Sequence, residues 1–132
     1  MIKSLDLFSG IGGFALGFQW AGIETAAFCE IEDYPTKVLK KNFPNIPIHR
    51  DIKELNGYDY EGIDIVTGGF PCQPLSLAGQ RKASADARDL WGEMYRVICE
   101  AQPKWVVAEN VPGLLSSESG RYFGRVLRNL AQ

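Results

Sequence analysis

The chain has 132 residues, of which 45% are hydrophobic, so it can form one domain with a modest core and is too apolar for a disordered chain. Its 14 basic and 16 acidic residues give a net charge of −2, which excludes a global basic field for nucleic acid and leaves only local clusters for such contacts. Cys29, Cys72 and Cys99 are widely spaced and His49 is the sole histidine, so neither a disulfide framework nor a metal site is expected. There is no signal peptide or membrane-length apolar run, so the default expectation is a cytoplasmic location.

Strand-like and helix-like segments alternate along the chain. Strands are predicted at Lys3–Phe8, Ile23–Glu30, Ile48–Ile52, Gly62–Gly69 and Lys104–Glu109. The fourth contains Ile63, Ile65 and Val66 without a break, a pattern typical of a strand buried on both faces. Such alternation predicts an α/β fold with a parallel sheet and right-handed crossovers.

Helices are predicted between these strands. The first runs from Gly12 to about Ala21 and ends at Gly22. The second starts near Asp33 and Pro35, with Tyr34, Val38 and Leu39 on one face, and is broken by the sequence NFPNIP. Residues 70–88 are polar and are predicted to be a mobile loop. Two further helices follow from the spacing of two apolar sets: Leu90, Met94, Val97, Ile98, Ala101; and Phe123, Val126, Leu127, Leu130.

A glycine-rich turn joins the first strand to the first helix. Gly10 and Gly12 permit positive φ and close approach of a ligand, and the helix start offers free N–H groups. Glu30 closes the next strand, where a carboxylate can accept hydrogen bonds from the two hydroxyls of a ribose. A ligand-free tight turn is the alternative for the glycines alone. With Glu30, a nucleoside-bearing ligand is favoured, and the pattern does not separate NAD from S-adenosylmethionine. Asp51 lies at the end of the third predicted strand, where its carboxylate can accept a hydrogen bond from an adenine amino group. The alternative is an ordinary aspartate of a surface turn.

Cys72 stands between Pro71 and Pro74, after the fourth strand. Most lone cysteines are buried and inert, and Cys29 and Cys99 fit that interpretation. Cys72 fits it poorly, because two prolines stiffen its loop as a positioned nucleophile requires. Glu109 ends the fifth strand and is the expected partner, since a carboxyl group after an apolar strand is unfavourable unless it is used.

In chain order, these motifs resemble the C5-cytosine DNA methyltransferase family over about residues 3–115. DLFSGIGGF resembles the S-adenosylmethionine loop, GGFPCQPLS the catalytic motif, and ENVPG the motif whose glutamate holds the cytosine. The resemblance implies a Rossmann-like S-adenosylmethionine-dependent methyltransferase fold, incomplete at the C-terminus. Residues 1–132 would form the N-terminal part of that catalytic domain.

The resemblance also implies roles for individual residues. Cys72 would be the nucleophile that attacks C6 of a cytosine flipped out of double-stranded DNA, and Glu109 would hold the ring. The expected contacts to the cofactor S-adenosylmethionine are Phe8, Gly10, Ile11, Gly12, Gly13, Glu30, Ile31, Asp51, Ile52, Pro71 and Leu90. The expected contacts to DNA are Gln73, Ser76, Gln80, Arg81 and Arg88, with Lys82 a further basic residue of that loop; a solvated charged loop is the alternative for Gln80, Arg81, Lys82 and Arg88.

The chain departs from the family pattern after ENVPG. The paired-arginine motif, the segment that reads the DNA target and the last cofactor-pocket motif have no counterpart in it. The expectation is therefore a fragment with little activity alone, completed by a missing C-terminal half or a second polypeptide, with a restriction–modification role expected from the family. The alternatives are a non-catalytic fragment that binds cofactor or DNA, and an NAD-dependent oxidoreductase, which leaves Cys72 and Glu109 unexplained.

Overall fold

A computed structural model describes residues 1–71 and 90–132. The strands are β1 (Lys3–Leu7), β2 (Glu24–Cys29), β3 (Ile48–His49), β4 (Ile65–Gly68) and β5 (Trp105–Ala108). The α-helices are α1 (Gly13–Trp20), α2 (Asp33–Asn42), α3 (Trp91–Ala101) and α4 (Arg121–Leu130). Short 3₁₀ helices cover Ile52–Glu54, Gly57–Tyr60, Pro112–Leu115 and Ser117–Gly120.

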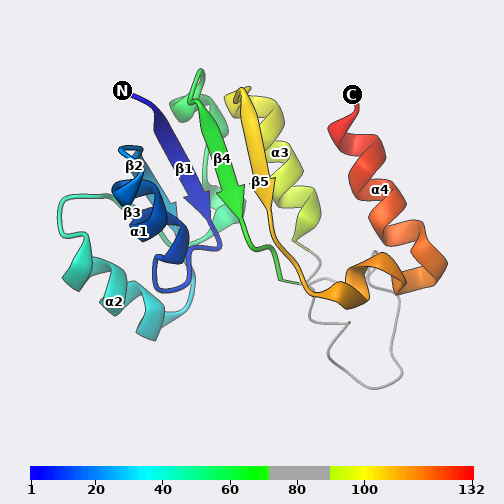
Figure 1. The fold of residues 1–132 in the computed structure, drawn as a ribbon, viewed down its shortest axis with the longest axis horizontal. Coiled ribbons are helices and arrows are strands. Elements are labelled where there is room, and N and C mark those ends of the chain that lie inside the picture. The colour runs from blue at the N-terminus through cyan, green and yellow to red at the C-terminus, as the bar shows by residue number, and fades with distance from the viewer. Residues whose placement is uncertain (72–89) are drawn as a thin grey trace.

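The five strands form one parallel sheet in the order β3-β2-β1-β4-β5 (Figure 1). The chain adds β2 and β3 on one side of β1 and then returns to add β4 and β5 on the other side. The strand order therefore reverses between β1 and β4, and in open α/β sheets ligands bind at the carboxyl ends of the strands at such a switch point. The predicted parallel α/β fold is confirmed.

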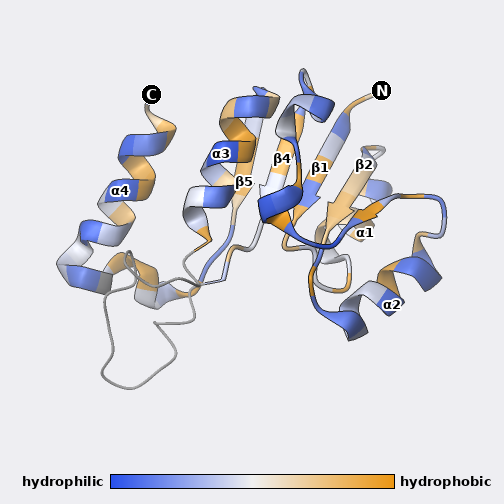
Figure 2. Ribbon diagram, turned by 180° about the vertical axis from the view of Figure 1, so that it is seen from behind, coloured by the Kyte–Doolittle hydropathy of each residue, from blue (hydrophilic) through white to orange (hydrophobic). Residues whose placement is uncertain are grey.

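Side chains of β2 pack on both faces of the sheet, because successive side chains of a strand point to opposite faces. Ala27 and Cys29 of β2 belong to a large apolar cluster with α3, whereas Phe28 packs with Ala15 and Leu39. Figure 2 shows mostly apolar strands β2 and β4 and helices of mixed hydropathy. The prediction that Ile63, Ile65 and Val66 are buried is confirmed.

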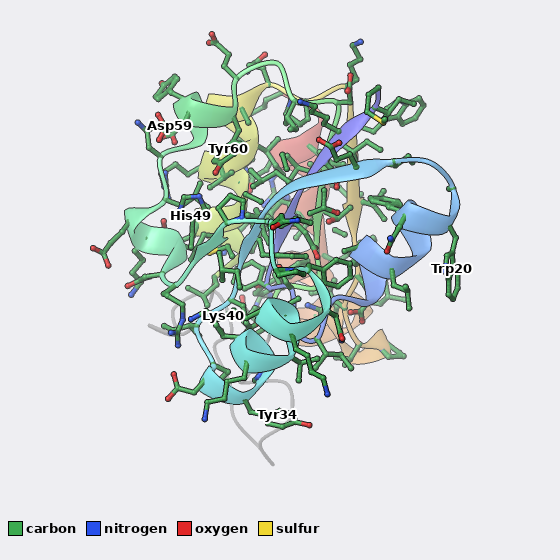
Figure 3. All side chains as sticks on the ribbon, turned by 90° about the vertical axis from the view of Figure 1, so that its left-hand side faces the viewer. Trp20, Tyr34, Lys40, His49, Asp59 and Tyr60 are labelled. Carbon is green, nitrogen blue, oxygen red and sulfur yellow. The ribbon has the colours of Figure 1, made fainter. Side chains whose placement is uncertain are left out.

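Three local predictions are corrected. Cys99 is exposed, because α3 buries Trp91, Met94, Val97 and Ala101 and leaves position 99 on the outer side. The buried residues of α2 are Thr36 and Leu39, and Tyr34 projects into solvent (Figure 3), so grouping Tyr34 with Leu39 was wrong. The third strand ends at His49, because Asp51 accepts a hydrogen bond from the Lys53 N–H and turns the chain into a 3₁₀ helix.

The helix boundaries otherwise agree with expectation. Gly22 has φ 81°, a left-handed conformation suited to the turn after α1. None of the helices in the described part of the chain combines the length and the apolar character that a bilayer crossing requires. The predicted loop at residues 70–88 lies, from residue 72 onward, outside the described residues.

Candidate active site

A cavity of about 550 Å³ opens at the carboxyl ends of the strands, beside the switch point. Its wall is drawn from segments that lie far apart in the sequence: the turn after β1, the ends of β2, β3 and β4, and the start of α3. The lining residues are Phe8, Gly10, Cys29, Glu30, Ile31, Glu32, Arg50, Asp51, Ile52, Lys53, Gly69, Pro71 and Leu90. Its volume is within the range of natural ligand pockets.

The turn after β1 has an unusual backbone. Phe8, Gly10 and Gly12 all have positive φ, at 53°, 58° and 97°. This region is strained for a bulky residue such as Phe8, and such strain is concentrated at functional sites. Gly12 has a second requirement, because a Cβ there would lie 2.9 Å from Cε2 of Phe43 on the neighbouring segment. The turn therefore combines a conformation that suits glycine with close packing.

Glu30 closes this turn from the end of β2. Its side chain is buried, and its Oε1 accepts a hydrogen bond from the Gly10 N–H at 2.7 Å. Its Oε2 accepts one from the Glu32 N–H at 2.9 Å. A carboxylate offers about four lone-pair positions, so both oxygens keep capacity for hydroxyl donors of a ligand. Two backbone N–H groups thus fix this carboxylate in the cavity wall.

Cys29 lines the same cavity as a neutral thiol. Burial, reinforced by the negative charges of Asp51 and Glu30, raises its pKa to about 12. The thiolate is the nucleophilic form of cysteine, so Cys29 is unreactive at neutral pH. The prediction that Cys29 is buried and inert is consistent with this environment. His49 is engaged elsewhere, since its Nε2 lies 2.6 Å from the Tyr60 hydroxyl (Figure 3).

A buried polar pair joins β1 to β4 beneath the site. Asp6 is 1% exposed, and its Oδ1 accepts a hydrogen bond from the Thr67 hydroxyl at 2.8 Å. Its Oδ2 has no hydrogen-bond partner among the residues that the structure describes. Burial raises the pKa of Asp6 to about 6, against the opposing effect of its hydrogen bonds. The pair connects the strand that carries the glycine turn with the strand that leads to Cys72.

Glu109 lies beside the end of β4. Its N–H donates to the Gly68 carbonyl at 3.0 Å, which continues the ladder between β4 and β5. Its Oε1 would be only 2.7 Å from a Cβ at position 69, so the absence of a side chain at Gly69 allows the carboxylate to occupy this place. Gly69 also lines the cavity. The structure therefore places the carboxylate of Glu109 next to the cavity wall at Gly69, three positions in sequence before Cys72.

Asn110 holds the same segment from its other side. Its Nδ2 donates to the Phe70 carbonyl at 2.6 Å, and its Oδ1 accepts from the Val111 N–H at 2.8 Å. Phe70 itself is buried and stacks at an angle on Trp91, with 5.1 Å between ring centroids. The backbone two residues before Cys72 is thus anchored by Asn110 and by the core.

Apart from Glu109, the predicted site residues fall into three groups. Eight of the expected cofactor residues line the cavity: Phe8, Gly10, Glu30, Ile31, Asp51, Ile52, Pro71 and Leu90. Ile11, Gly12 and Gly13 lie outside its wall, with Ile11 exposed and Gly12 serving as the N-cap of α1. Cys72, Gln73, Ser76, Gln80, Arg81, Lys82 and Arg88 lie outside the described residues.

Three residues of this region were missed by sequence reasoning. Gly69 and Asn110 are adjacent to predicted motif positions, so proximity in sequence was the available signal. Arg50 lines the cavity from the segment after β3, and only its position next to Asp51 pointed to it. No cluster of three or more His, Cys, Asp or Glu side chains placed to hold a metal ion occurs among the described residues.

Known proteins are similar to this chain over almost its whole length. Residues 2–132 match the family model described as C-5 cytosine-specific DNA methylase. The type II methyltransferase M.NgoMIV of Neisseria gonorrhoeae is 38% identical over 131 residues, which are 98% of this chain and 42% of that protein. M1.ScrFI of Lactococcus lactis subsp. cremoris is 39% identical over 132 residues, 98% of this chain and 34% of that protein.

Solved structures agree with the fold. A prophage-encoded protein of Escherichia coli, described as a DNA modification methyltransferase, superposes with a TM-score of 0.82 at 30% identity and covers 99% of this chain and 38% of its own. The Dnmt2 methyltransferase of S. pombe gives a TM-score of 0.74 at 25% identity, over 98% of this chain and 42% of its own. The chain thus spans about two fifths or less of the relatives named here. The predicted Rossmann-like methyltransferase fold is confirmed, and the chain belongs to the C-5 cytosine-specific DNA methylase family.

Proposed function

We propose that this chain is the catalytic portion of a DNA (cytosine-5-)-methyltransferase, which binds S-adenosylmethionine in the cavity and attacks a flipped cytosine with Cys72. One observation carries the proposal. A single cavity joins the turn closed by Glu30 and Gly10 to Gly69 and Pro71, the residues that lead directly into Cys72. Methyl donor and nucleophile would therefore meet at one edge of the sheet.

The cavity wall fits S-adenosylmethionine. Glu30 keeps lone pairs for the two ribose hydroxyls, and Asp51 offers a carboxylate for an adenine amino group. Phe8, Ile31 and Leu90 supply apolar surface for the adenine ring. When bound, the cofactor supplies an electrophilic methyl group on a positively charged sulfur.

The chain's own residues would then activate the base. The Cys72 thiolate adds to C6 of cytosine, and the electron pair of the C5–C6 bond makes C5 nucleophilic. Glu109 hydrogen-bonds N3 and the exocyclic amine, which stabilises the charge that develops on the ring. C5 would then accept the methyl group that the bound cofactor supplies. Transfer of the C5 proton to water would expel Cys72 as its thiolate and restore the aromatic ring.

The target base must leave the duplex, because C6 is out of reach inside the stack. Gln73, Ser76, Gln80, Arg81 and Arg88 follow Cys72 closely in sequence and are the proposed DNA contacts. Before Cys72 in the sequence, the Phe70 carbonyl accepts a hydrogen bond from Asn110, which limits the movement of that segment. A restrained start to the loop would keep the nucleophile near the methyl donor.

Additional polypeptide would complete the enzyme. β5 is an edge strand, and its Trp105 and Val107 are 69% and 42% exposed. Trp105 and Val107 point to the same face of the sheet, and large apolar side chains exposed there are typical of a surface that another segment covers. We therefore propose that a segment equivalent to the rest of the longer relatives packs on β5, in the same chain or in a second one.

Trapping of the covalent intermediate tests the function. DNA that contains 5-fluorocytosine blocks the final elimination, because fluorine replaces the proton that must leave. A chimera completed with the remaining part of M.NgoMIV should form a covalent complex that depends on S-adenosylmethionine, and the chain alone should form little of it. The Cys72→Ser variant should form none. A complex that survives this substitution contradicts the role of Cys72. Cofactor binding without any complex, even in the chimera, would instead favour a non-catalytic binding fragment.

A further inference from the structure

Arg50 makes three hydrogen bonds to the turn that follows β2. Its Nε donates to the Glu30 carbonyl at 3.1 Å, and its Nη2 donates to the Ile31 carbonyl at 2.9 Å. The same Nη2 lies 2.6 Å from Oδ1 of Asp33, at the start of α2. One guanidinium therefore bridges the end of β2 and the first turn of α2.

These contacts are on the backbone of the residues that face the proposed ligand. The Glu30 N–H completes the ladder to β3 by donating to the His49 carbonyl at 2.9 Å, and beyond this point the chain leaves the sheet. The Glu30 and Ile31 carbonyls then need other donors, because unpaired backbone groups are unfavourable. The Thr36 hydroxyl donates to the Glu30 carbonyl at 3.3 Å, and Arg50 donates to both carbonyls from a rigid planar group that a lysine ammonium cannot reproduce.

The side chain of Glu30 is held at the same time from the other direction. The N–H groups of Gly10 and Glu32 fix its two carboxylate oxygens, at 2.7 Å and 2.9 Å. The main chain of Glu30 is thus fixed by Arg50 and its side chain by the glycine turn. Ile31, which is 63% exposed and lines the cavity, has its carbonyl held in the same way.

We propose that Arg50 is a positioning residue for the adenosine half of the ligand, acting through the backbone of Glu30 and Ile31. This inference rests on the proposed function, since it takes the cavity as the cofactor site. It differs from a simple electrostatic role. A positive charge on the cavity wall would favour the carboxylate of the methionine half, whereas a positioned turn favours the ribose and the adenine.

Ligand binding by three variants separates these roles. S-adenosylhomocysteine and adenosine are titrated into the ¹⁵N-labelled chain and followed by NMR. Arg50→Met should weaken the binding of both ligands by the same factor, about tenfold or more. The free energy of hydrogen bonds from a charged donor is large enough for a change in affinity of that size. Arg50→Lys should not restore binding. Lys37→Met removes an exposed positive charge of α2, outside the cavity wall, and should change both affinities by less than about twofold.

Two results would overturn the inference. One is full binding by Arg50→Lys, which would show that charge alone suffices. The other is a loss confined to S-adenosylhomocysteine, which would place the effect on the methionine half. Amide exchange tests positioning without any ligand: the Gly10 and Glu32 N–H groups should exchange faster in Arg50→Met, while core amides of β1 and β4 stay unchanged. If the wild-type chain binds neither ligand, the proposed function fails, and the exchange rates still decide the positioning role.

Discussion

The Oε1 atom of Glu109 occupies the space that a side chain at Gly69 would fill, 2.7 Å from the Cβ position. Gly69 directly precedes Phe70, Pro71 and Cys72. The proposed catalytic carboxylate therefore lies against the residue at which the segment leading to Cys72 begins. Gly69 does not have the positive φ seen at Gly10 and Gly12, so its requirement is space and not conformation.

Gly69→Ala should impair catalysis far more than folding. The new methyl group would displace the flexible end of Glu109 and leave the backbone in place, so the free energy of unfolding should change by less than about 1 kcal/mol. Misplacement of a catalytic group by about 1 Å can slow a reaction roughly 10²-fold, and a loss of that order is expected for covalent complex formation by the chimera. Gly17→Ala, in open space on α1, is the control. Equal effects of the two substitutions would refute the steric argument.

Glu30→Gln should weaken binding of S-adenosylhomocysteine. An amide can accept from only one of the two N–H groups that now share the carboxylate, and its NH₂ would face the other donor. A loss of about 2 kcal/mol, or roughly 30-fold in affinity, is expected from calorimetry. Glu32→Gln changes a second acid of the cavity wall without removing an acceptor from these bonds, and it should bind nearly as the wild type does. Equal losses in both variants would show that only total charge matters.

Asp6 should give the fold a distinctive pH dependence. Its pKa is raised from 3.8 to about 6, so between these values the native state binds a proton that the unfolded state has released. The contribution of Asp6 to the free energy of unfolding is fully present below about pH 4. It is lost as the pH rises through 6, by about 3 kcal/mol in total. Urea unfolding from pH 4 to 7 measures this effect.

Asp6→Asn supplies the comparison for that measurement, because asparagine keeps an acceptor for the Thr67 hydroxyl and does not titrate. Relative to the wild type, this variant should gain stability steadily from pH 4 to 7. Parallel curves for the two proteins would mean that Asp6 titrates normally.

Asn110→Asp should separate nucleophile positioning from cofactor binding. The substitution removes the donor to the Phe70 carbonyl and sets a negative charge against it. Covalent complex formation by the chimera should slow by roughly tenfold or more, while affinity for S-adenosylhomocysteine changes by less than about twofold. Asn56→Asp is a matched control, because the Oδ1 of Asn56 only caps the 3₁₀ helix at Gly57–Tyr60. A parallel loss of cofactor affinity in Asn110→Asp would contradict the assignment.

Much of the fold follows from local patterns. Apolar runs typical of strands precede Gly10 and Gly68, and the apolar residues of α3 recur with the helical period. This alternation of strand and helix patterns predicts a parallel sheet. The same patterns place Glu30, Asp51 and Pro71 at strand ends, so their meeting at one edge of the sheet could be expected before the structure was known.

Other features depend on contacts that no local pattern contains. Arg50 acts on carbonyls of the turn that follows β2, and Asn110 on a carbonyl forty positions earlier in the chain. Cys99 was expected to be buried because most lone cysteines are, whereas the buried residues of its helix, among them Met94 and Val97, leave position 99 exposed. The strand at Ile48 was predicted too long, because the capping bond of Asp51 competes with continued pairing.

Calorimetry of the 132-residue chain with S-adenosylhomocysteine and, separately, NAD tests the central claim most directly, since every residue of the described cavity is present in it. The account predicts saturable binding of one S-adenosylhomocysteine per chain, weakened by Glu30→Gln, with NAD binding far more weakly. Preferential binding of NAD would contradict the claim and revive the oxidoreductase alternative, and binding of neither ligand would show that the cavity is not a cofactor site in this chain.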